Sequence, residues 1–483
     1  MNNQNRTPLF DALVEYNRRK PAYFRVPGHR YENGINPILL EAVGDAVFSF
    51  DLTETPLLDD LHNATGPIRE AEQLAADLWG ADYTHFLVNG TTCGNEAMIL
   101  TALHGGGTVA VPRNAHKSAL MGLILSGGNP AYIMPELEEE WGLHGGVHPD
   151  TVEEVFRVHP DCKGVFIVSP TYYGIASDLK SIAEICHRHD AILMVDEAHG
   201  AHCYFSDDLP KGALELGADV CVQSIHKVAG SLTQSSMLHV KSDRIKKSRM
   251  DSNLTLVQST SPSYLLMLSL DMARHDIARR GKQMIDRAAA LAANARERIN
   301  AIPGMACAGR ELIGKAAIFD YDVTRLIVSA NAIGITGFDL QKMLFSEYNI
   351  DMELANYRNV LGIVTFANEQ ENLDVLVDAL ADIAHKHRDG SPLPPAEKLP
   401  PQPEYVLSPR NAYFSDRERI PWVDAKGRIA SEMIAPYPPG IPVIYPGERV
   451  SEEVWDYVEA FRQRNGHLHG PSDAKLSTFV VVR

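Results

Sequence analysis

"AILMVDEAHG", residues 191–200, is a run of apolar residues that ends in two acids and a histidine. An unbroken apolar run of this length indicates a strand buried on both faces, because a strand with one face in water alternates apolar and polar residues. ADVCVQSIHK (218–227) has the same form and ends in Lys227. The two stretches therefore predict buried strands whose ends carry chemically active side chains.

Further short apolar runs alternate with helical stretches in the same part of the chain. The apolar runs are THFLVNG (84–90), GTVAVP (107–112), AYIMP (131–135) and GVFIVSP (164–170), and the helical stretches include PIREAEQLAADLWG (67–80) and LKSIAEICHRHD (179–190). This alternation predicts an α/β fold with a largely parallel sheet covered by helices on both faces. Ligands of such sheets bind beyond the carboxyl ends of the strands. The polar residues at those ends fall in segments 89–95, 171–174, 196–199 and 224–227.

The chain of 483 residues is too long for one simple core, so we expect two or three domains. A long helix over 265–301 is predicted as a connector, and the proline-rich stretch after residue 390 as a linker. The predicted order is an N-terminal arm (1–80), a large domain (81–300), a small α+β domain (301–390), the linker (391–409) and a C-terminal module (410–483).

Composition excludes several classes of partner. A formal charge of −17 argues against nucleic acid or an anionic membrane. Six cysteines without a CxxC pair indicate reduced thiols, and neither a signal-like apolar region nor a stretch of about 18 apolar residues occurs. We therefore expect a soluble, cytoplasmic protein with no metal, nucleic-acid or membrane partner.

Lys227 lies in QSIHKVAGSLTQSS (223–236), between His226 and a run of hydroxyl side chains. A lysine among both polar and apolar neighbours is most often a solvated surface charge. The alternative is a lysine that forms a Schiff base with pyridoxal 5'-phosphate, whose phosphate is held by nearby hydroxyls such as Ser224. The rest of the chain decides between these interpretations, because this cofactor requires further groups.

A carboxylate is needed to keep the pyridine nitrogen of this cofactor protonated, and Asp196 at the end of the first strand is the candidate. Ala198 and His199 follow in the same turn and are candidates for the cofactor site. Taken alone, a strand-end aspartate is about as often a cap of the following turn. Its position before a strand that ends in lysine favours the functional interpretation.

The phosphate and the ring need two more elements. NGTTCGNEAM (89–98) can hold a phosphate through Gly90, Thr91 and Thr92, because its backbone N–H groups open a helix. His116 in RNAHKS (113–118) can stack on the pyridine ring. Many strand–helix turns look like the first stretch, and a lone loop histidine is more often merely exposed.

Seven stretches together resemble the Orn/Lys/Arg decarboxylase family of fold-type I pyridoxal-phosphate enzymes. They are LDDLHNATGPIREAEQLAADLWGADYTHFLVNGTT, RNAHKS, SPTYYGIASDLKSI, VDEAHGAH, SIHKVAGSLTQSS and, in the C-terminal module, APYPPGIP with VIYPGE. The resemblance runs from about residue 7 to 480 and is closest to the short biosynthetic arginine decarboxylases of Firmicutes. It implies an aspartate aminotransferase-like large domain with smaller α+β domains on its C-terminal side. FRVPGHR (24–30) departs from the FHVPGHK usual in the family.

The resemblance implies decarboxylation of a basic amino acid, with L-arginine giving agmatine and CO₂ for polyamine biosynthesis. Lysine and ornithine are alternative substrates, and an aminotransferase, aldolase or oxidase on the same fold is an alternative activity. A non-catalytic homologue that binds a regulator is a third. Glu353, Glu448 and Asp60 are candidates to bind the distal cation of the substrate, although acidic loop residues are more often solvated.

The resemblance also implies a homodimer or larger homo-oligomer with shared active sites. QSTSPSY (258–264) resembles the family segment that sends a hydroxyl to the phosphate of the neighbouring subunit. Thr260 is the candidate donor, with Ser259 and Ser261 beside it. A helix N-cap is an equally good interpretation of any one of these hydroxyls.

Overall fold

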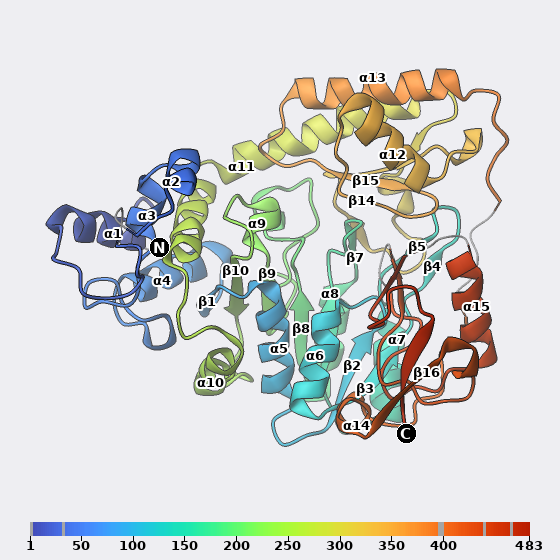
Figure 1. Cartoon of the computed structure of the whole chain (residues 1–483), viewed down its shortest axis with the longest axis horizontal. Coiled ribbons are helices and arrows are strands. Elements are labelled where there is room, and N and C mark those ends of the chain that lie inside the picture. Colours follow the sequence, from blue (N-terminus) through green and yellow to red (C-terminus); the bar gives the residue numbers. More distant parts are fainter. Residues whose placement is uncertain (1–2, 31–33, 395–399, 438–440, 464–466) are drawn as a thin grey trace. The chain divides into compact units, whose positions relative to one another are not determined.

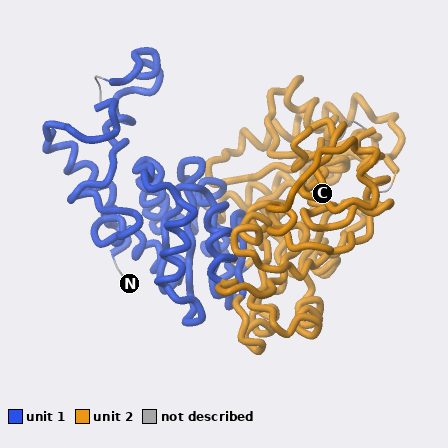
Figure 2. The backbone as a smooth tube through the Cα atoms, turned by 60° about the horizontal axis from the view of Figure 1, so that its bottom comes forward, with its two compact units in different colours: residues 1–101, 193–206, 211–284 blue, residues 102–192, 207–210, 285–483 orange. Residues whose placement is uncertain are grey.

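The computed structural model describes residues 3–30, 34–394, 400–437, 441–463 and 467–483. The chain divides into two compact units, unit 1 with residues 1–101, 193–206 and 211–284, and unit 2 with residues 102–192, 207–210 and 285–483 (Figure 2). The domain bounds given above stay a prediction. Parts of the linker (395–399) and of the APYPPGIP motif (438–440) lie outside the described residues.

Unit 1 contains strands in the order β1 (Tyr83–Leu87), β10 (Ser236–Val240), β9 (Val220–Gln223) and β8 (Ile192–Asp196). β8 and β9 are parallel, whereas β10 runs antiparallel to both β9 and β1. The unit also contains the helices α1 (Pro8–Arg19), α4 (Pro67–Trp79), α5 (Gly90–Ala102), α9 (Ile225–Val228) and α10 (Lys247–Val257), and the first part of α11 (Tyr264–Asn300) (Figure 1).

Unit 2 contains a parallel set of strands in the order β6 (Cys162–Val168), β2 (Thr108–Pro112) and β3 (Asn129–Ile133). Its helices in this region are α6 (Lys117–Ser126), α7 (Pro149–Val158) and α8 (Leu179–Arg188). All five residues of β2 are buried, as expected for an interior strand of a parallel sheet. Together with β1, β8 and β9, these strands confirm each strand that the apolar runs predict.

β10 is a strand of unit 1 that the sequence interpretation missed. Its five residues are all buried, but it follows a run of hydroxyl residues and contains a histidine, so its apolar signal is short. His239 lies inside the sheet because Thr84 Oγ1 and Gln223 Oε1 lie 2.7 and 3.1 Å from its two ring nitrogens. These bonds satisfy a polar ring that burial would otherwise penalise.

Two further modules complete unit 2. In the first, the sheet β11 (Ala306–Cys307), β13 (Arg325–Ser329), β15 (Val360–Ile363) and β14 (Leu354–Ala355) shares one apolar core with α12 (Gly337–Tyr348), α13 (Gln370–Lys386) and the end of α11 (Figure 1). The second is the C-terminal module, with α14 (Pro409–Phe414), the pair β16 (Arg417–Pro421) and β19 (Thr478–Val482), the pair β17 (Ala435–Tyr437) and β18 (His467–His469), and α15 (Glu452–Gln463).

The C-terminal module has its own apolar core. Trp422, Val454 and Phe479 are among the buried residues that form it. In the described part of the chain no helix combines the length and the apolar character needed to cross a membrane. All six cysteines are buried.

Candidate active site

Lys227 lies in α9, the short helix that directly follows β9 in unit 1. Its Nζ is 2.9 Å from Nε2 of His199, which follows β8. His199 is buried and Lys227 is half-buried. The two predicted residues thus meet because β8 and β9 are parallel and end at the same edge. A lysine amine beside an imidazole nitrogen can exchange a proton with it.

Asp196, the last residue of β8, is 3% exposed. Its Oδ2 accepts a hydrogen bond of 2.7 Å from the amide of Asn95, and its Oδ1 accepts one of 3.1 Å from the backbone N–H of Ala198. Both donors are uncharged. The carboxylate is therefore oriented by neutral groups and can still pair with a cation that enters the site.

Hydroxyl groups gather at the N-terminus of α5. Thr91 Oγ1 lies 2.5 Å from Ser224 Oγ and 3.2 Å from Ser236 Oγ. Gly90 before it has a φ of 69°, a left-handed conformation that glycine adopts without strain. A helix N-terminus with hydroxyls beside it suits a phosphate dianion. Thr92, the other predicted hydroxyl, is half-buried in the same turn.

Gly94 lets α5 lie close to the sheet. A Cβ built on Gly94 would lie 2.4 Å from Cγ2 of Val222, so a larger residue would push the helix away from β9.

His226 is held through Nδ1, which donates to the carbonyl of Ser235 at 2.8 Å. Burial lowers the pKa of His226, so the neutral ring is favoured.

The predicted intersubunit segment also belongs to unit 1. Gln258 is buried and its Oε1 accepts the backbone N–H of Val88 at 2.9 Å, while Thr260 beyond it is exposed. Asp60 caps a short helix by accepting the N–H of His62 at 2.9 Å. That bond uses one of its carboxylate oxygens, so Asp60 has a local structural role.

The other predicted residues lie in unit 2. His116 is the N-cap of α6: its Nδ1 accepts the backbone N–H of Ser118 at 3.3 Å and lies 2.8 Å from the Ser118 hydroxyl. Since Nδ1 accepts, the neutral ring carries its proton on Nε2. Glu353 is exposed and accepts a hydrogen bond from the hydroxyl of Tyr172.

Glu448 has a different environment from the one that a substrate anchor needs. It is fully buried, and both of its oxygens accept hydrogen bonds from the guanidinium of Arg113, at 2.5 and 3.0 Å. Oε2 also accepts the backbone N–H of Tyr445 at 2.7 Å. Its charge is thus compensated by the protein itself. The prediction that Glu448 binds the distal cation of a substrate does not fit this geometry.

Sequence reasoning gave no individual role to Asn95, Arg113 or Tyr172, although all three lie in segments that it singled out. Arg113 had a usable signal, because an arginine directly after a fully apolar strand needs a buried partner. Asn95 and Tyr172 had only their places in strand-end loops. Among the described residues, no cluster of three His, Cys, Asp or Glu side chains has an arrangement that could hold a metal ion.

Comparison with known proteins gives matches over nearly the whole chain. The family model described as Orn/Lys/Arg decarboxylase, major domain, matches residues 7–372, and that of the Orn/Lys/Arg decarboxylase C-terminal domain matches residues 396–473. An arginine decarboxylase of Halalkalibacterium halodurans is 40% identical over 100% of this chain and 99% of its own length. One of Bacillus subtilis is 39% identical over 99% of this chain and 98% of its own.

Solved structures show the same fold at lower identity. Lysine decarboxylase A from Pseudomonas aeruginosa superposes with a TM-score of 0.86 and 21% identity, over 99% of this chain and 80% of that one. An alanine–glyoxylate aminotransferase from Nostoc sp. matches with a TM-score of 0.54 and 18% identity, over 72% of this chain and 92% of that one. The predicted α/β fold of the aminotransferase-like type is thereby confirmed.

Proposed function

The chain belongs to the Orn/Lys/Arg decarboxylase family, and from that premise we propose that it decarboxylates L-arginine to agmatine and CO₂ with pyridoxal 5'-phosphate as cofactor. The observation that carries the choice of arginine is the identity of 38–40% to proteins named arginine decarboxylase, three of which match at least 99% of this chain. A relative named lysine decarboxylase LdcA is 25% identical. Lysine and ornithine remain the alternative substrates.

The residues of unit 1 fit the proposed cofactor. Thr91, Ser224 and the N-terminus of α5 would hold its phosphate, and Lys227 would carry it covalently. Asp196 has neutral donors, so its charge suits a protonated ring nitrogen. When bound, the cofactor supplies an electron sink for the electron pair that CO₂ leaves behind.

The chain's own groups then have distinct tasks. Lys227 supplies the amine that holds the cofactor, and His199, 2.9 Å from it, can take or return the proton of that amine. Asp196 would keep the pyridine nitrogen of the cofactor protonated, because an ionised aspartate stabilises a cationic neighbour. By family resemblance, His116 contributes a ring that stacks on the cofactor.

Substrate orientation needs an anchor at the far end of the side chain. Since Glu448 is paired within the protein, we assign this role to Glu353, whose carboxylate is exposed and oriented by Tyr172. A guanidinium fixed at that end would be bound by energy remote from the reacting carboxylate. We also propose a cytoplasmic homodimer or larger homo-oligomer in which Thr260 donates to the phosphate of the neighbouring subunit.

The test is a substrate panel. The purified protein, with added pyridoxal phosphate, is assayed for CO₂ release from arginine, lysine and ornithine, and kcat/KM is compared. We expect arginine to be preferred by tenfold or more, because a site that reads a guanidinium leaves paired acceptors unfilled by an ammonium. A preference for lysine or ornithine would change the proposed substrate but not the family. Activity only with an added keto acid would identify an aminotransferase instead.

A further inference from the structure

The YPGE motif of the C-terminal module forms a tight turn. The N–H of Glu448 donates to the carbonyl of Tyr445 at 3.1 Å, and Gly447 has a φ of 94°. Proline followed by glycine at the two central positions is the signature of a type II turn. A Cβ on Gly447 would lie 2.1 Å from the carbonyl oxygen of Leu407, so this position requires glycine. The turn therefore gives the Glu448 side chain a fixed direction.

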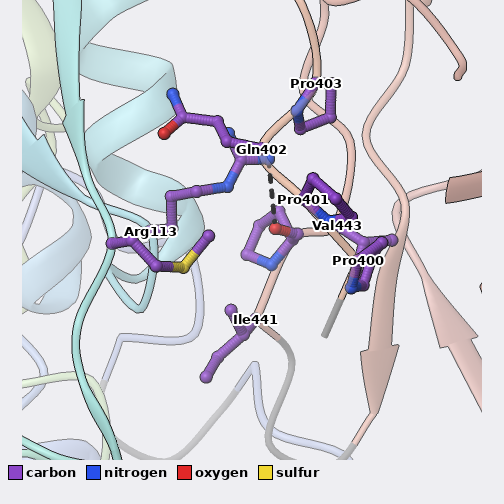
Figure 3. A pocket seen from close by; sticks show the side chains of 9 residues that line it. Arg113, Pro400, Pro401, Gln402, Pro403, Ile441 and Val443 are labelled. Atoms are coloured by element: carbon purple, nitrogen blue, oxygen red, sulfur yellow. Dashed lines mark hydrogen bonds between the residues drawn. The ribbon is translucent and has the colours of Figure 1, made fainter. Parts of the chain in front are cut away.

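That direction brings Glu448 to Arg113. The guanidinium makes two parallel hydrogen bonds to the carboxylate. A third, of 3.3 Å, goes to the carbonyl of Pro442, which lines the small cavity drawn in Figure 3. Its central carbon lies 5.1 and 4.8 Å from the ring centres of Tyr132 and Tyr445. Bidentate pairing requires the planar fork of arginine, and the cationic group also interacts favourably with the two aromatic rings.

The pair is shielded from solvent. Arg113 is 1% exposed and Glu448 is 0% exposed. The cavity beside Arg113, under residues 400–403, has a volume of about 10 Å³, which is room for one water at most (Figure 3). The pair is thus a structural link between the C-terminal module and the strand–loop segment that contains Arg113.

The segment that Arg113 opens leads directly to His116. The backbone N–H of Arg113 donates to the carbonyl of Ile133 at 2.8 Å. The backbone N–H of Ala115 donates to the carbonyl of Pro112 at 2.9 Å, and this bond closes a turn around Arg113. His116 comes next and caps α6. The C-terminal module also holds the other end of α6, because Arg410 donates to the carbonyls of Ile124 and Leu125 at 2.9 and 3.1 Å.

We propose that Arg113 is a positioning residue, whose buried pair with Glu448 sets the orientation of the turn that presents the His116 ring to the cofactor. The inference rests on the proposed function, because it takes from there the role of His116. It assigns the C-terminal module an indirect part in cofactor binding, through the turn that leads to His116.

Glu448→Asp tests the link with little change in chemistry. The shorter side chain keeps the charge but draws the carboxylate away from the guanidinium. We expect the apo-protein to bind pyridoxal phosphate roughly tenfold more weakly, measured by absorbance titration, and kcat to fall while KM changes less. Arg449→Gln is the matched control, since Arg449 pairs with Glu404 at the surface and should leave both values unchanged.

A double-mutant cycle separates positioning from general damage. In a His116→Ala background, Glu448→Asp should no longer weaken cofactor binding, because the ring it orients is gone. An equal loss in both backgrounds would overturn the inference and leave a purely structural pair. Arg113→Lys, which keeps the charge but loses the bidentate contact, serves as the second variant if Glu448→Asp does not fold.

A readout without cofactor keeps the two proposals apart. Hydrogen exchange of the backbone amides of residues 114–118 in the apo-protein should be faster in Glu448→Asp than in the wild type and in Arg449→Gln. Unchanged exchange overturns the inference even if the enzyme is an active decarboxylase. If the wild type does not bind pyridoxal phosphate, the proposed function fails, while faster exchange in Glu448→Asp still supports the link to the His116 turn.

Discussion

Asp196 and Glu448 are both buried carboxylates, but their partners differ in charge. Asp196 accepts hydrogen bonds from the amide of Asn95 and from a backbone N–H, whereas Glu448 accepts two from the guanidinium of Arg113. A buried charge that only neutral groups solvate is costly, and a bound cation can offset that cost. The charge of Glu448 is therefore compensated within the protein, whereas that of Asp196 suits the protonated ring nitrogen that we propose as its partner.

The largest expected effect tests the premise that Asp196 serves a cofactor held by Lys227. Lys227→Ala should leave less than about a thousandth of the activity and abolish the absorbance of the bound cofactor, because the covalent link and the proton carrier are lost together. Activity and absorbance spectra measure both effects. Lys246→Ala, an exposed lysine of the same unit, is the control. Near wild-type turnover in Lys227→Ala would remove the premise.

Asp196→Asn addresses the comparison directly. The neutral amide cannot keep the ring nitrogen protonated, so we expect kcat to fall by about two to three orders of magnitude while the cofactor stays bound. Steady-state kinetics and the cofactor content of the purified variant give the two numbers. A normal rate would show that another group keeps the ring nitrogen protonated and that Asp196 does not have the proposed role.

Glu197, like Asp196, is a buried carboxylate whose hydrogen-bond donors are uncharged. Burial raises its pKa to about 7, against the effect of hydrogen bonds from Gln223, Ala213 and Tyr204. Between pH 4.5 and about 7, Glu197 is therefore protonated in the folded state and ionised in the unfolded state. This stabilisation is present below the unfolded pKa of 4.5 and is lost as the pH rises through about 7.

The expected loss is at most about 3 kcal/mol in the free energy of unfolding, and it should be missing in Glu197→Gln. The measurement is the difference in Tm between about pH 5 and about pH 8 for both apo-proteins, where Glu197→Gln should show the smaller pH dependence. Because the amide of glutamine faces donors, the variant should also be less stable overall at about pH 5. Identical pH dependence in both proteins would contradict the raised pKa.

The smallest effect is expected at an exposed carboxylate. Glu353→Gln should lower kcat/KM for arginine by roughly tenfold and leave cofactor binding unchanged, because water screens an exposed pair more than a buried one. Arginine, lysine and ornithine should be assayed together, with Asp351→Asn, an exposed acid two residues away, as the matched control. If neither the rate nor the preference changes in Glu353→Gln, the distal cation is bound by other residues.

Much of the fold could be predicted because its signals are local. The apolar runs gave β1, β2, β3, β6, β8 and β9. Asp196, His199 and Lys227 could be proposed as site residues because each lies at the end of such a run or within four residues of it. β10 was missed because it contains a histidine whose partners, Thr84 and Gln223, are on neighbouring strands. A single sequence does not show that such a residue will be satisfied.

The missed site residues depend on contacts between distant parts of the chain. Asn95 meets Asp196 across 101 positions, and Arg113 meets Glu448 across 335. The YPGE motif was visible in the sequence, but the charge on Glu448 suggested a ligand because its arginine partner was not known. The residue type indicated a cationic partner, and the structure identifies Arg113, in place of a substrate, as that partner.

The separation of Arg113 and Glu448 along the chain has a consequence for synthesis. Proteins are made from the N-terminus, so the segment with His116 leaves the ribosome long before residue 448 does. Until residue 448 has been translated, Arg113 lacks the carboxylate with which it pairs in the folded protein. During synthesis the turn around Arg113 therefore forms before the ion pair that joins it to the C-terminal module can form.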